Sequence, residues 1–295
     1  MPASKVLSEQ DLEHFMEFGW VRVAQAYSRS DALAAQMDLW AEVEKRGVMR
    51  EDRATWTVPL LRMNENYDTP AFRRCNTARL ADAIEDVIGR DRWLGRGKTV
   101  QWGWWPVNFA NGADQEWDVP VQGWHWDGIH FRHHVDSPDQ GLLCLCIFSD
   151  VAPQGGGTVV VEGSHKVVAR YLAGKPDGVD LGDGIREVME GHPWFRALGG
   201  RDPLPEEAVD RKSFFMNPFT DADGITLRVI ETTAEAGDVI LCHPFLFHAT
   251  AQNLTGVPRF MCNRTTPLSE RLQLKRASEA DYSALELSIR RALDL

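Results

Sequence analysis

Cysteine is scarce in this sequence, and no long apolar run occurs in it. The five cysteines include no Cys-x-x-Cys pair, which argues against a disulfide framework and favours free thiols in a reducing cytoplasm. Cys144 and Cys146 would share one face of a strand, so we interpret them as small core residues, with a metal-binding pair as the alternative. No segment approaches the roughly 20 apolar residues of a membrane span, and the first residues lack the apolar centre of a secretory signal. The sequence therefore predicts a cytoplasmic protein with no membrane partner.

Positive charge is also in deficit. There are 32 Lys and Arg residues against 43 Asp and Glu, which gives a formal net charge of −11. An acidic surface argues against nucleic acid or an anionic membrane as the main partner. A small-molecule substrate remains compatible with it, because the local charge in a pocket can oppose the net charge. The charge gives no indication of the oligomeric state.

The pattern along the chain predicts a mainly β protein with flanking helices. We expect helices at 8–18, 30–46, 77–88 and 277–295. In the second of these, the predicted apolar stripe consists of Leu33, Met37, Trp40 and Val43. Short β-branched or aromatic strands, separated by Gly, Pro and Asp turns, are expected at 100–109, 142–148, 158–162, 226–232, 238–242 and 259–265. Many short strands with such turns are typical of a sandwich or barrel.

We predict one domain, 1–295, because helices precede and follow a single run of strands. Its parts are a helical 1–99, a β core at 100–270 and the final helix. The stretch 167–211, rich in Gly, Pro and Asp, interrupts the core and should contain one or two helical pieces. An insertion of this length is usually functional, so we predict a mobile lid. The stretch 49–70 is not assigned.

A short motif carries the chemistry. His125 and Asp127 stand in the segment Gly-Trp-His-Trp-Asp-Gly, and a further histidine, His248, follows much later. Two imidazoles and one carboxylate on one face of a ferrous ion leave three positions open, which is the pattern of non-haem Fe(II) oxygenases. 2-Oxoglutarate would take two of these positions and O2 the third.

Two late histidines compete for the third ligand position. His243 and His248 are an odd number of residues apart, so on an extended strand they would face opposite ways. Only His248 is followed in register by Asn253 and Arg259, and the planar guanidinium of Arg259 could bind the distal carboxylate of 2-oxoglutarate bidentately. We therefore choose His248 and interpret His243 as a residue behind the ligands or in the core.

Taken together, these motifs resemble the phytanoyl-CoA dioxygenase family of Fe(II)/2-oxoglutarate oxygenases. The matching elements are His125-Trp126-Asp127, the glycine-rich turn from Gly155 to Gly163-Ser164-His165, Gly237-Asp238, His248, Asn253 and Arg259. The resemblance implies a double-stranded β-helix, a cupin-like jelly-roll, and coupled decarboxylation of 2-oxoglutarate to succinate and CO2. We expect hydroxylation of a small metabolite, with desaturation or ring closure left open. Asp127 argues against a halogenase, whose site has a small residue at this position.

Position along the chain suggests further contacts. We predict that Thr158 and Gln101 touch 2-oxoglutarate beside Arg259. Residues predicted to touch substrate, with packing or surface roles as the alternative, are Trp104, Asn108, Gln122, Trp126 and Arg132. His165 is expected to make a structural hydrogen bond, with metal ligation as the alternative. We expect His130, His133 and His134 to lie in a loop as solvated or hydrogen-bonded residues, with a second metal site as the alternative.

Two other functions stay open on the sequence alone. One is a metal-dependent cupin-like isomerase or lyase that uses no 2-oxoglutarate, and Arg259 counts against it. The other is a jelly-roll that binds a ligand without turnover, and the complete set of three ligands and an arginine counts against that.

Overall fold

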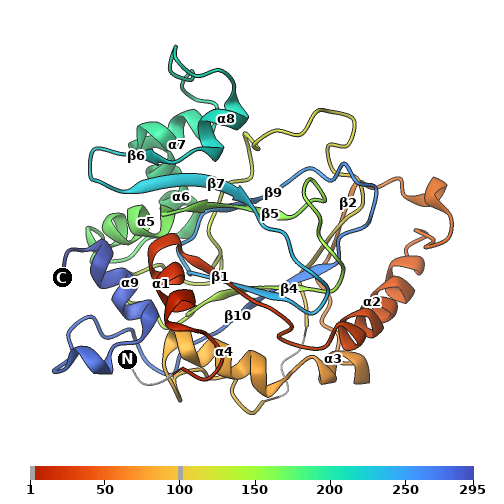
Figure 1. The fold of residues 1–295 in the computed structure, drawn as a ribbon, viewed down its shortest axis with the longest axis horizontal. Helices are drawn as coiled ribbons and strands as arrows, with labels where there is room; N and C mark the ends of the chain where they lie inside the picture. Colours follow the sequence, from red (N-terminus) through yellow and green to blue (C-terminus); the bar gives the residue numbers. More distant parts are fainter. Residues whose placement is uncertain (1–3, 99–101) are drawn as a thin grey trace.

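Two four-stranded antiparallel sheets form the centre of the computed structural model, which describes residues 4–98 and 102–295. The first sheet has the order β1 (Trp20–Val23), β8 (Val239–Cys242), β4 (Leu143–Ile147) and β10 (Met261–Thr265). The second has the order β6 (Phe219–Thr220), β7 (Thr226–Glu231), β5 (Thr158–Glu162) and β9 (His248–Thr250). Figure 1 shows β7, β5 and β9 above β1, β4 and β10. A two-stranded ribbon, β2 (Leu60–Met63) and β3 (Trp105–Asn108), lies at one end.

Alternation along β4 explains how both faces of the first sheet are buried. Leu145 and its neighbours two residues away pack with Val160 of β5 and Ile240 of β8, which places them between the two sheets. Cys144 and Cys146 point the other way, into the cluster formed with the N-terminal helices. Both are buried free thiols, so the prediction that they are core residues is confirmed.

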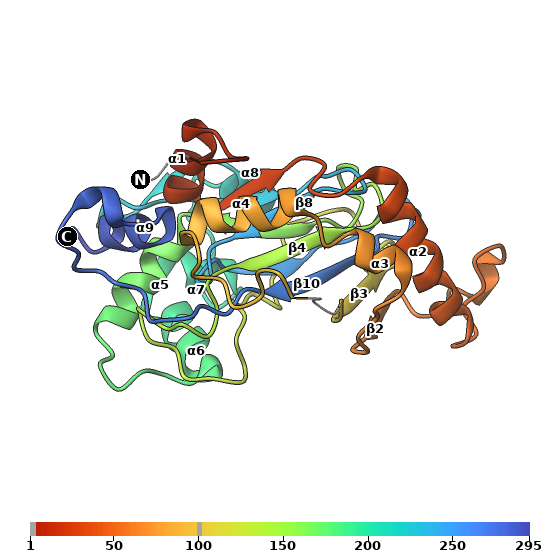
Figure 2. The same ribbon diagram turned by 90° about the horizontal axis from the view of Figure 1, so that it is seen from below.

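The N-terminal helices cover the outer face of the first sheet (Figure 2). They are α1 (Glu9–Phe18), α2 (Arg29–Glu44), the short α3 (Pro70–Arg74) and α4 (Ala78–Ile88). Ser8, Ser28 and Thr77 cap α1, α2 and α4 with their side chains, which is why the predicted helix starts lie within a residue or two of the observed ones.

The predicted apolar stripe of α2 is wrong in part. Trp40 and Val43 are buried, but Leu33 and Met37 are 36% and 45% exposed. The buried face of the helix instead includes two small residues, and it consists of Ala32, Ala35, Leu39, Trp40 and Val43.

At the other end of the chain, the predicted helix is shorter than expected. The helix α9 covers only Ala284–Ala292, since Ser283 caps it, and a single 3-10 turn, Glu279–Asp281, precedes it. Residues 100 and 101 of the predicted strand 100–109 lie outside the described residues, and β3 covers only Trp105–Asn108 of the rest. Trp104 just before it has a φ of 60° that a regular strand does not allow.

The stretch 167–211 is more helical than predicted. The helices lie beside the second sheet in Figure 1 and are α5 (Ser164–Ala173), α6 (Leu181–Gly191), α7 (Pro193–Leu198) and α8 (Arg211–Met216). Val168, Trp194 and Phe195 are among their buried side chains, so these helices contribute to the core. Among the helices of the described residues, none has the length and apolar character needed to cross a membrane.

Candidate active site

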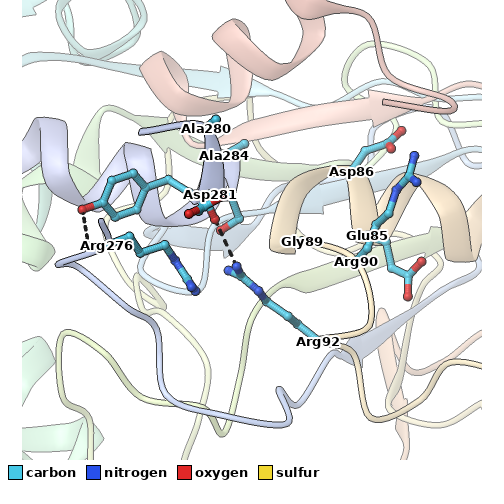
Figure 3. A pocket seen from close by; sticks show the side chains of 11 residues that line it. Glu85, Asp86, Gly89, Arg90, Arg92, Arg276, Ala280, Asp281 and Ala284 are labelled. Atoms are coloured by element: carbon cyan, nitrogen blue, oxygen red, sulfur yellow. Dashed lines mark hydrogen bonds between the residues drawn. The ribbon is translucent and has the colours of Figure 1, made fainter. Parts of the chain in front are cut away.

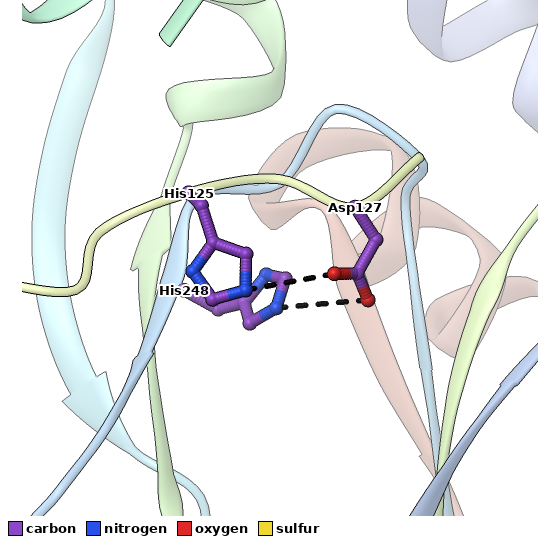
Figure 4. A group of neighbouring side chains, drawn as sticks. All are labelled: His125, Asp127 and His248. Carbon is purple, nitrogen blue, oxygen red and sulfur yellow. Dashed lines mark ion pairs between the residues drawn. The ribbon is translucent and has the colours of Figure 1, made fainter. Parts of the chain in front are cut away.

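His125 and His248 are direct neighbours across two antiparallel segments. The amide of His125 donates to the carbonyl of His248 at 3.1 Å, and the amide of His248 donates back at 2.8 Å. Residues paired in this way project their side chains to the same face. Asp127 follows His125 by two residues and therefore shares that face. A pairing between distant parts of the chain thus creates the predicted triad (Figure 4).

The three side chains converge on one small volume. One ligand atom from each of His125, Asp127 and His248 lies within 4.8 Å of the others. Nε2 of His125 is 3.5 Å from one carboxylate oxygen of Asp127, and Nε2 of His248 is 3.9 Å from the other. The side-chain amide of Asn263 on β10 donates a hydrogen bond of 3.4 Å to the carboxylate of Asp127 and restrains its position. In the described part of the chain this is the one group of three or more such residues close enough to hold a metal.

Backbone carbonyls fix the orientation of both imidazoles. Nδ1 of His125 is 2.7 Å from the carbonyl of Gly123, and Nδ1 of His248 is 3.1 Å from that of Leu246. A carbonyl oxygen can only accept a hydrogen bond, so Nδ1 carries the hydrogen in each neutral ring and Nε2 is left with a free lone pair. Nε2 of His248 is buried without a hydrogen-bond partner among the described residues. A metal ion would satisfy that atom.

Burial and neighbouring charges shift the pKa values of the three side chains in different directions. Burial is the main influence on His248 and lowers the pKa of its imidazole to about 4, so the ring is neutral at pH 7. Burial also opposes the charged forms of the other two. The hydrogen bond and charge of Asp127 outweigh it and raise the pKa of His125, while both histidines and Asn263 hold the pKa of Asp127 below its ordinary value.

A cavity of about 350 Å³ runs from the triad between the two sheets. Its lining includes Leu145 of β4, Thr158 of β5 and Arg259 just before β10. Arg62 and Asn64 enter it from β2 and the residues that follow. The cavity therefore joins the triad to a buried cationic side chain.

Arg259 is buried with little compensation for its charge. It is 1% exposed, and within residues 4–98 and 102–295 no carboxylate pairs with it. Its Nη2 donates to the carbonyl of Pro106 at 2.8 Å. Its Nη1 donates to the sulfur of Met261 at 2.9 Å and lies 3.5 Å from the hydroxyl of Thr158, and Nε has no partner among the described residues. Burial lowers the pKa of the guanidinium to about 10, which still leaves it charged at neutral pH. A buried cation of this kind could form charge-assisted hydrogen bonds with an anion in the cavity.

The structure brings some of the predicted contacts to this cavity and not others. Thr158 and Trp104 line it, beside Arg259. Gln101 lies outside the described residues.

Two of the residues predicted to contact substrate, Asn108 and Trp126, have side chains that make contacts within the fold. The amide of Asn108 donates to the carbonyl of Ala251 and accepts from a backbone amide, and it is fully buried. Trp126 stands between two ligands and must face away from them by strand alternation. Its ring packs against Phe247 and donates to His133.

Two further predicted substrate contacts lie away from the cavities that adjoin the triad. Gln122 is exposed on the surface. Arg132 donates to Asp180 and to the carbonyls of Asp177 and Gly178, so it ties the loop after the triad to the start of α6.

The remaining histidines have structural positions. His243 is buried, stacks on Phe15 and lies 4.8 Å from His165 between ring centroids, outside the metal-binding group. His165 pairs with the carbonyl of Met16, as expected for a structural hydrogen bond. His133 is likewise hydrogen-bonded, to Trp126 and the carbonyl of Gly128.

Sequence reasoning missed Asn263, Arg62 and Asn64. Asn263 faces the cavity because it lies two residues after Met261 on β10, so alternation from Arg259 could have identified it. Arg62 and Asn64 belong to the unassigned stretch 49–70, which carries no motif. Only the pairing of β2 with β3 brings them to the site.

A larger hollow of about 540 Å³ lies elsewhere, between the end of α4 and the start of α9 (Figure 3). Two of its arginines already have partners: Arg92 and Arg276 both donate to the buried Glu286 at 2.7 Å. Arg92 also donates to the carbonyl of Asp281. Because these charges are compensated within the fold, the cavity beside the triad is the better candidate for chemistry.

A His-Asp-His triad of this kind fits an iron and 2-oxoglutarate site. No family model matches the chain. Among solved structures, it is similar to HygX from Streptomyces hygroscopicus with nickel and 2-oxoglutarate bound, at 14% identity over 88% of this chain and 86% of that chain (TM-score 0.45). It is also similar to the epimerase SnoN in complex with Fe3+, alpha ketoglutarate and nogalamycin RO, at 16% identity over 86% and 81% (TM-score 0.45). EctD from S. alaskensis with bound Fe matches at 16% identity over 89% and 77% (TM-score 0.48). Each of these TM-scores is below 0.5, so any function assigned to this chain depends on the geometry of its own residues.

Proposed function

We propose that this protein is an Fe(II)- and 2-oxoglutarate-dependent dioxygenase that hydroxylates a small molecule and releases succinate and CO2. One observation carries the proposal: His125, Asp127 and His248 converge at one end of a cavity whose wall holds the buried, unpaired cation of Arg259. The two sheets would then be those of a double-stranded β-helix, in a relative of the phytanoyl-CoA dioxygenases.

The donor set favours iron over other metals. Two neutral imidazoles and one carboxylate on one side of a ferrous ion leave the opposite positions open, whereas structural zinc sites close all four. When bound, Fe(II) would bring 2-oxoglutarate and O2 together and supply the oxidising chemistry. His125 and His248 would hold it through Nε2, since backbone carbonyls occupy both Nδ1 atoms. Asn263 would keep the carboxylate of Asp127 in position.

Arg259 and Thr158 would bind the distal carboxylate of 2-oxoglutarate. The guanidinium supplies charge-assisted donors, and the Thr158 hydroxyl lies 3.5 Å from Nη1. This pair would fix the orientation of the cosubstrate in the cavity. The choice between hydroxylation, desaturation and ring closure then depends on which substrate atom faces the metal.

The decisive experiment is an anaerobic titration of the apo-protein with Fe(II) and then 2-oxoglutarate, followed by exposure to O2. Release of succinate in the presence of a small-molecule panel is the expected result. His248→Ala should abolish Fe(II) binding and succinate release. The matched control His243→Ala should keep Fe(II) bound, because His243 lies outside the metal-binding group.

The same titration separates the alternatives. Binding of both Fe(II) and 2-oxoglutarate with no O2 uptake under any condition would favour a non-catalytic binding protein. Turnover of a substrate without consumption of 2-oxoglutarate would favour an isomerase or lyase. Loss of Fe(II) in His243→Ala and retention in His248→Ala would show that the triad is wrongly assigned.

A further inference from the structure

A second cavity adjoins the triad on the side away from Arg259. Its volume is about 400 Å³, within the range usual for small-molecule sites. It shares Trp104, Asp127 and Asn263 with the first cavity. The loop from Asp127 to Phe131 and the residues Asp139 and Gln140 form the rest of its wall, together with Thr265. A ligand here would lie next to the metal position without entering the cavity of Arg259.

Gln140 is the most unusual residue of this wall. Its side chain is 4% exposed, yet neither Oε1 nor Nε2 has a hydrogen-bond partner among the described residues. Buried amides are almost always paired, because an unpaired one loses its hydration and gains nothing in return. Oδ1 of Asn263 is buried and unpaired in the same way, while its Nδ2 is used on Asp127. One donor, Nε2 of Gln140, and two acceptors, Oε1 of Gln140 and Oδ1 of Asn263, therefore have no partner within the described residues.

The charge of this cavity is negative. Besides Asp127, whose charge a metal would offset, it contains the carboxylate of Asp139, which is exposed and has no ion pair in the described chain. His130 is the one basic residue in the described lining of the cavity, and the nearby Arg132 donates to Asp180. Anionic ligands such as phosphate esters are disfavoured here, and a cationic group is favoured.

Trp104 supplies a flat apolar surface between the two cavities. It is 54% exposed although it is a large aromatic residue, and its positive φ of 60° is costly for a bulky side chain. Its backbone carbonyl accepts from the amide of Asn263, which holds this conformation. An exposed indole beside a carboxylate can bind an ammonium group through cation–π attraction as well as an apolar ring or chain.

We propose that this second cavity binds the substrate that is oxidised, and that the substrate is a small amine with a neutral hydrogen-bonding group and no phosphate or carboxylate. Gln140 and Asn263 bind the neutral polar group, and Asp139 with Trp104 binds the ammonium. This inference rests on the proposed function, since it takes the triad as the metal centre.

A charge series of constant shape tests the assignment. Tyramine, 4-hydroxyphenylacetamide and 4-hydroxyphenylacetate carry a cation, a neutral amide and an anion on the same hydroxyphenyl group. Saturation-transfer NMR on the shared ring protons measures binding of each to the Fe(II)- and 2-oxoglutarate-loaded protein under argon, up to about 10 mM. Tyramine should bind roughly fivefold more tightly than the amide, and the anion most weakly.

Two variants and their matched controls assign the effect to the named residues. Asp139→Asn should remove the preference for tyramine, whereas Asp136→Asn, in the same loop but paired with Arg271, should keep it. Gln140→Leu should weaken all three probes and also raise the thermal unfolding midpoint, because it removes an unpaired buried amide without changing the volume much. Gln122→Leu, on the exposed surface, should change neither.

The outcomes separate this inference from the proposed function. If Fe(II) and 2-oxoglutarate bind but no probe does, or the anion binds as well as tyramine, the substrate assignment is wrong and the metal centre stands. Unchanged probe binding in Gln140→Leu and Asp139→Asn overturns it equally. Failure of the wild type to bind Fe(II) or 2-oxoglutarate overturns the proposed function itself.

Discussion

Replacing Arg259 should make the apo-protein more stable while it destroys the binding site for 2-oxoglutarate. The guanidinium is 1% exposed and has no carboxylate partner in the described chain. Burial lowers its pKa from 12.5 to about 10. Each pH unit corresponds to about 1.36 kcal/mol, so the buried charge costs the apo fold roughly 3 kcal/mol.

The direction of the pKa shift of Arg259 determines how the cost of burying its charge depends on pH. The folded-state pKa of Arg259 lies below the unfolded value, so folding disfavours the charged form. The penalty is fully present below about pH 10 and is relieved only as the pH rises through that value. Stability differences between the wild type and an Arg259 variant should therefore be constant between pH 6 and pH 9.

Arg259→Met keeps most of the length and removes the charge. The variant loses the hydrogen bond to Pro106 as well, so we expect a net gain of about 1–2 kcal/mol in the free energy of unfolding of the apo-protein. Affinity for 2-oxoglutarate should fall about a hundredfold, since charge-assisted hydrogen bonds contribute roughly 1.5–3 kcal/mol each. Arg259→Lys should lose nearly as much, because an ammonium cannot form the bidentate pair.

Urea unfolding without ligands and anaerobic equilibrium dialysis with Fe(II) and labelled 2-oxoglutarate measure the two effects. Arg62→Met is the control, because Arg62 lines the same cavity but is exposed. Unchanged 2-oxoglutarate affinity in Arg259→Met, or a larger loss in Arg62→Met, would refute the assignment. A destabilised apo Arg259→Met would refute the claim that its charge is uncompensated.

Three further predictions concern other parts of the chain. Asn263→Ala should lower Fe(II) affinity by about tenfold in a competition titration, because it removes the hydrogen bond that holds the Asp127 carboxylate; equal affinity would show that the contact is incidental. The buried His165 has a pKa of about 3, lowered by burial, so the unfolded chain binds its proton first and stability should fall below pH 6.5, by about 2 kcal/mol at pH 5. Urea midpoints at pH 7 and pH 5 should show a smaller difference in His165→Phe than in the wild type. Limited proteolysis should cut first in 199–210, where Val209 is 90% exposed, and more slowly with Fe(II), 2-oxoglutarate and substrate bound; equal rates would make this loop no part of a lid.

Much of the β core could be predicted because its strands carry their own signals. The strand predicted at 158–162 coincides with β5, and the helix predicted at 77–88 begins one residue before α4 because Thr77 is its cap. Hydrophobic runs, turn residues and caps are local properties. The positions that could not be predicted depend on pairing between distant segments. Nothing local marks β2, which pairs with β3 and brings Arg62 to the cavity.

The predicted substrate contacts have a different basis. Trp126 is predicted as a contact because it stands between two ligands, but strand alternation sends its side chain to the opposite face, where it packs on Phe247. Asn108 is predicted as a contact because it lies on a strand that enters the site, but its amide makes hydrogen bonds with backbone groups of the fold. A polar residue near a motif serves the fold whenever backbone groups around it need partners.

Whether a buried polar group has partners within the fold also distinguishes structural residues from residues that could bind a ligand. Asn108 is buried, and both polar atoms of its amide have partners within the fold, so it stabilises the apo-protein. Arg259 and Gln140 are just as buried, and each keeps polar atoms without a partner among the described residues. They line different cavities, one on each side of the carboxylate of Asp127. Each unpaired buried group destabilises the apo fold. Only a bound molecule of complementary charge or hydrogen bonding removes this free-energy cost. Because one group is cationic and the other neutral in an acidic wall, the two cavities would select different molecules: a dicarboxylate on one side of the metal and an amine on the other.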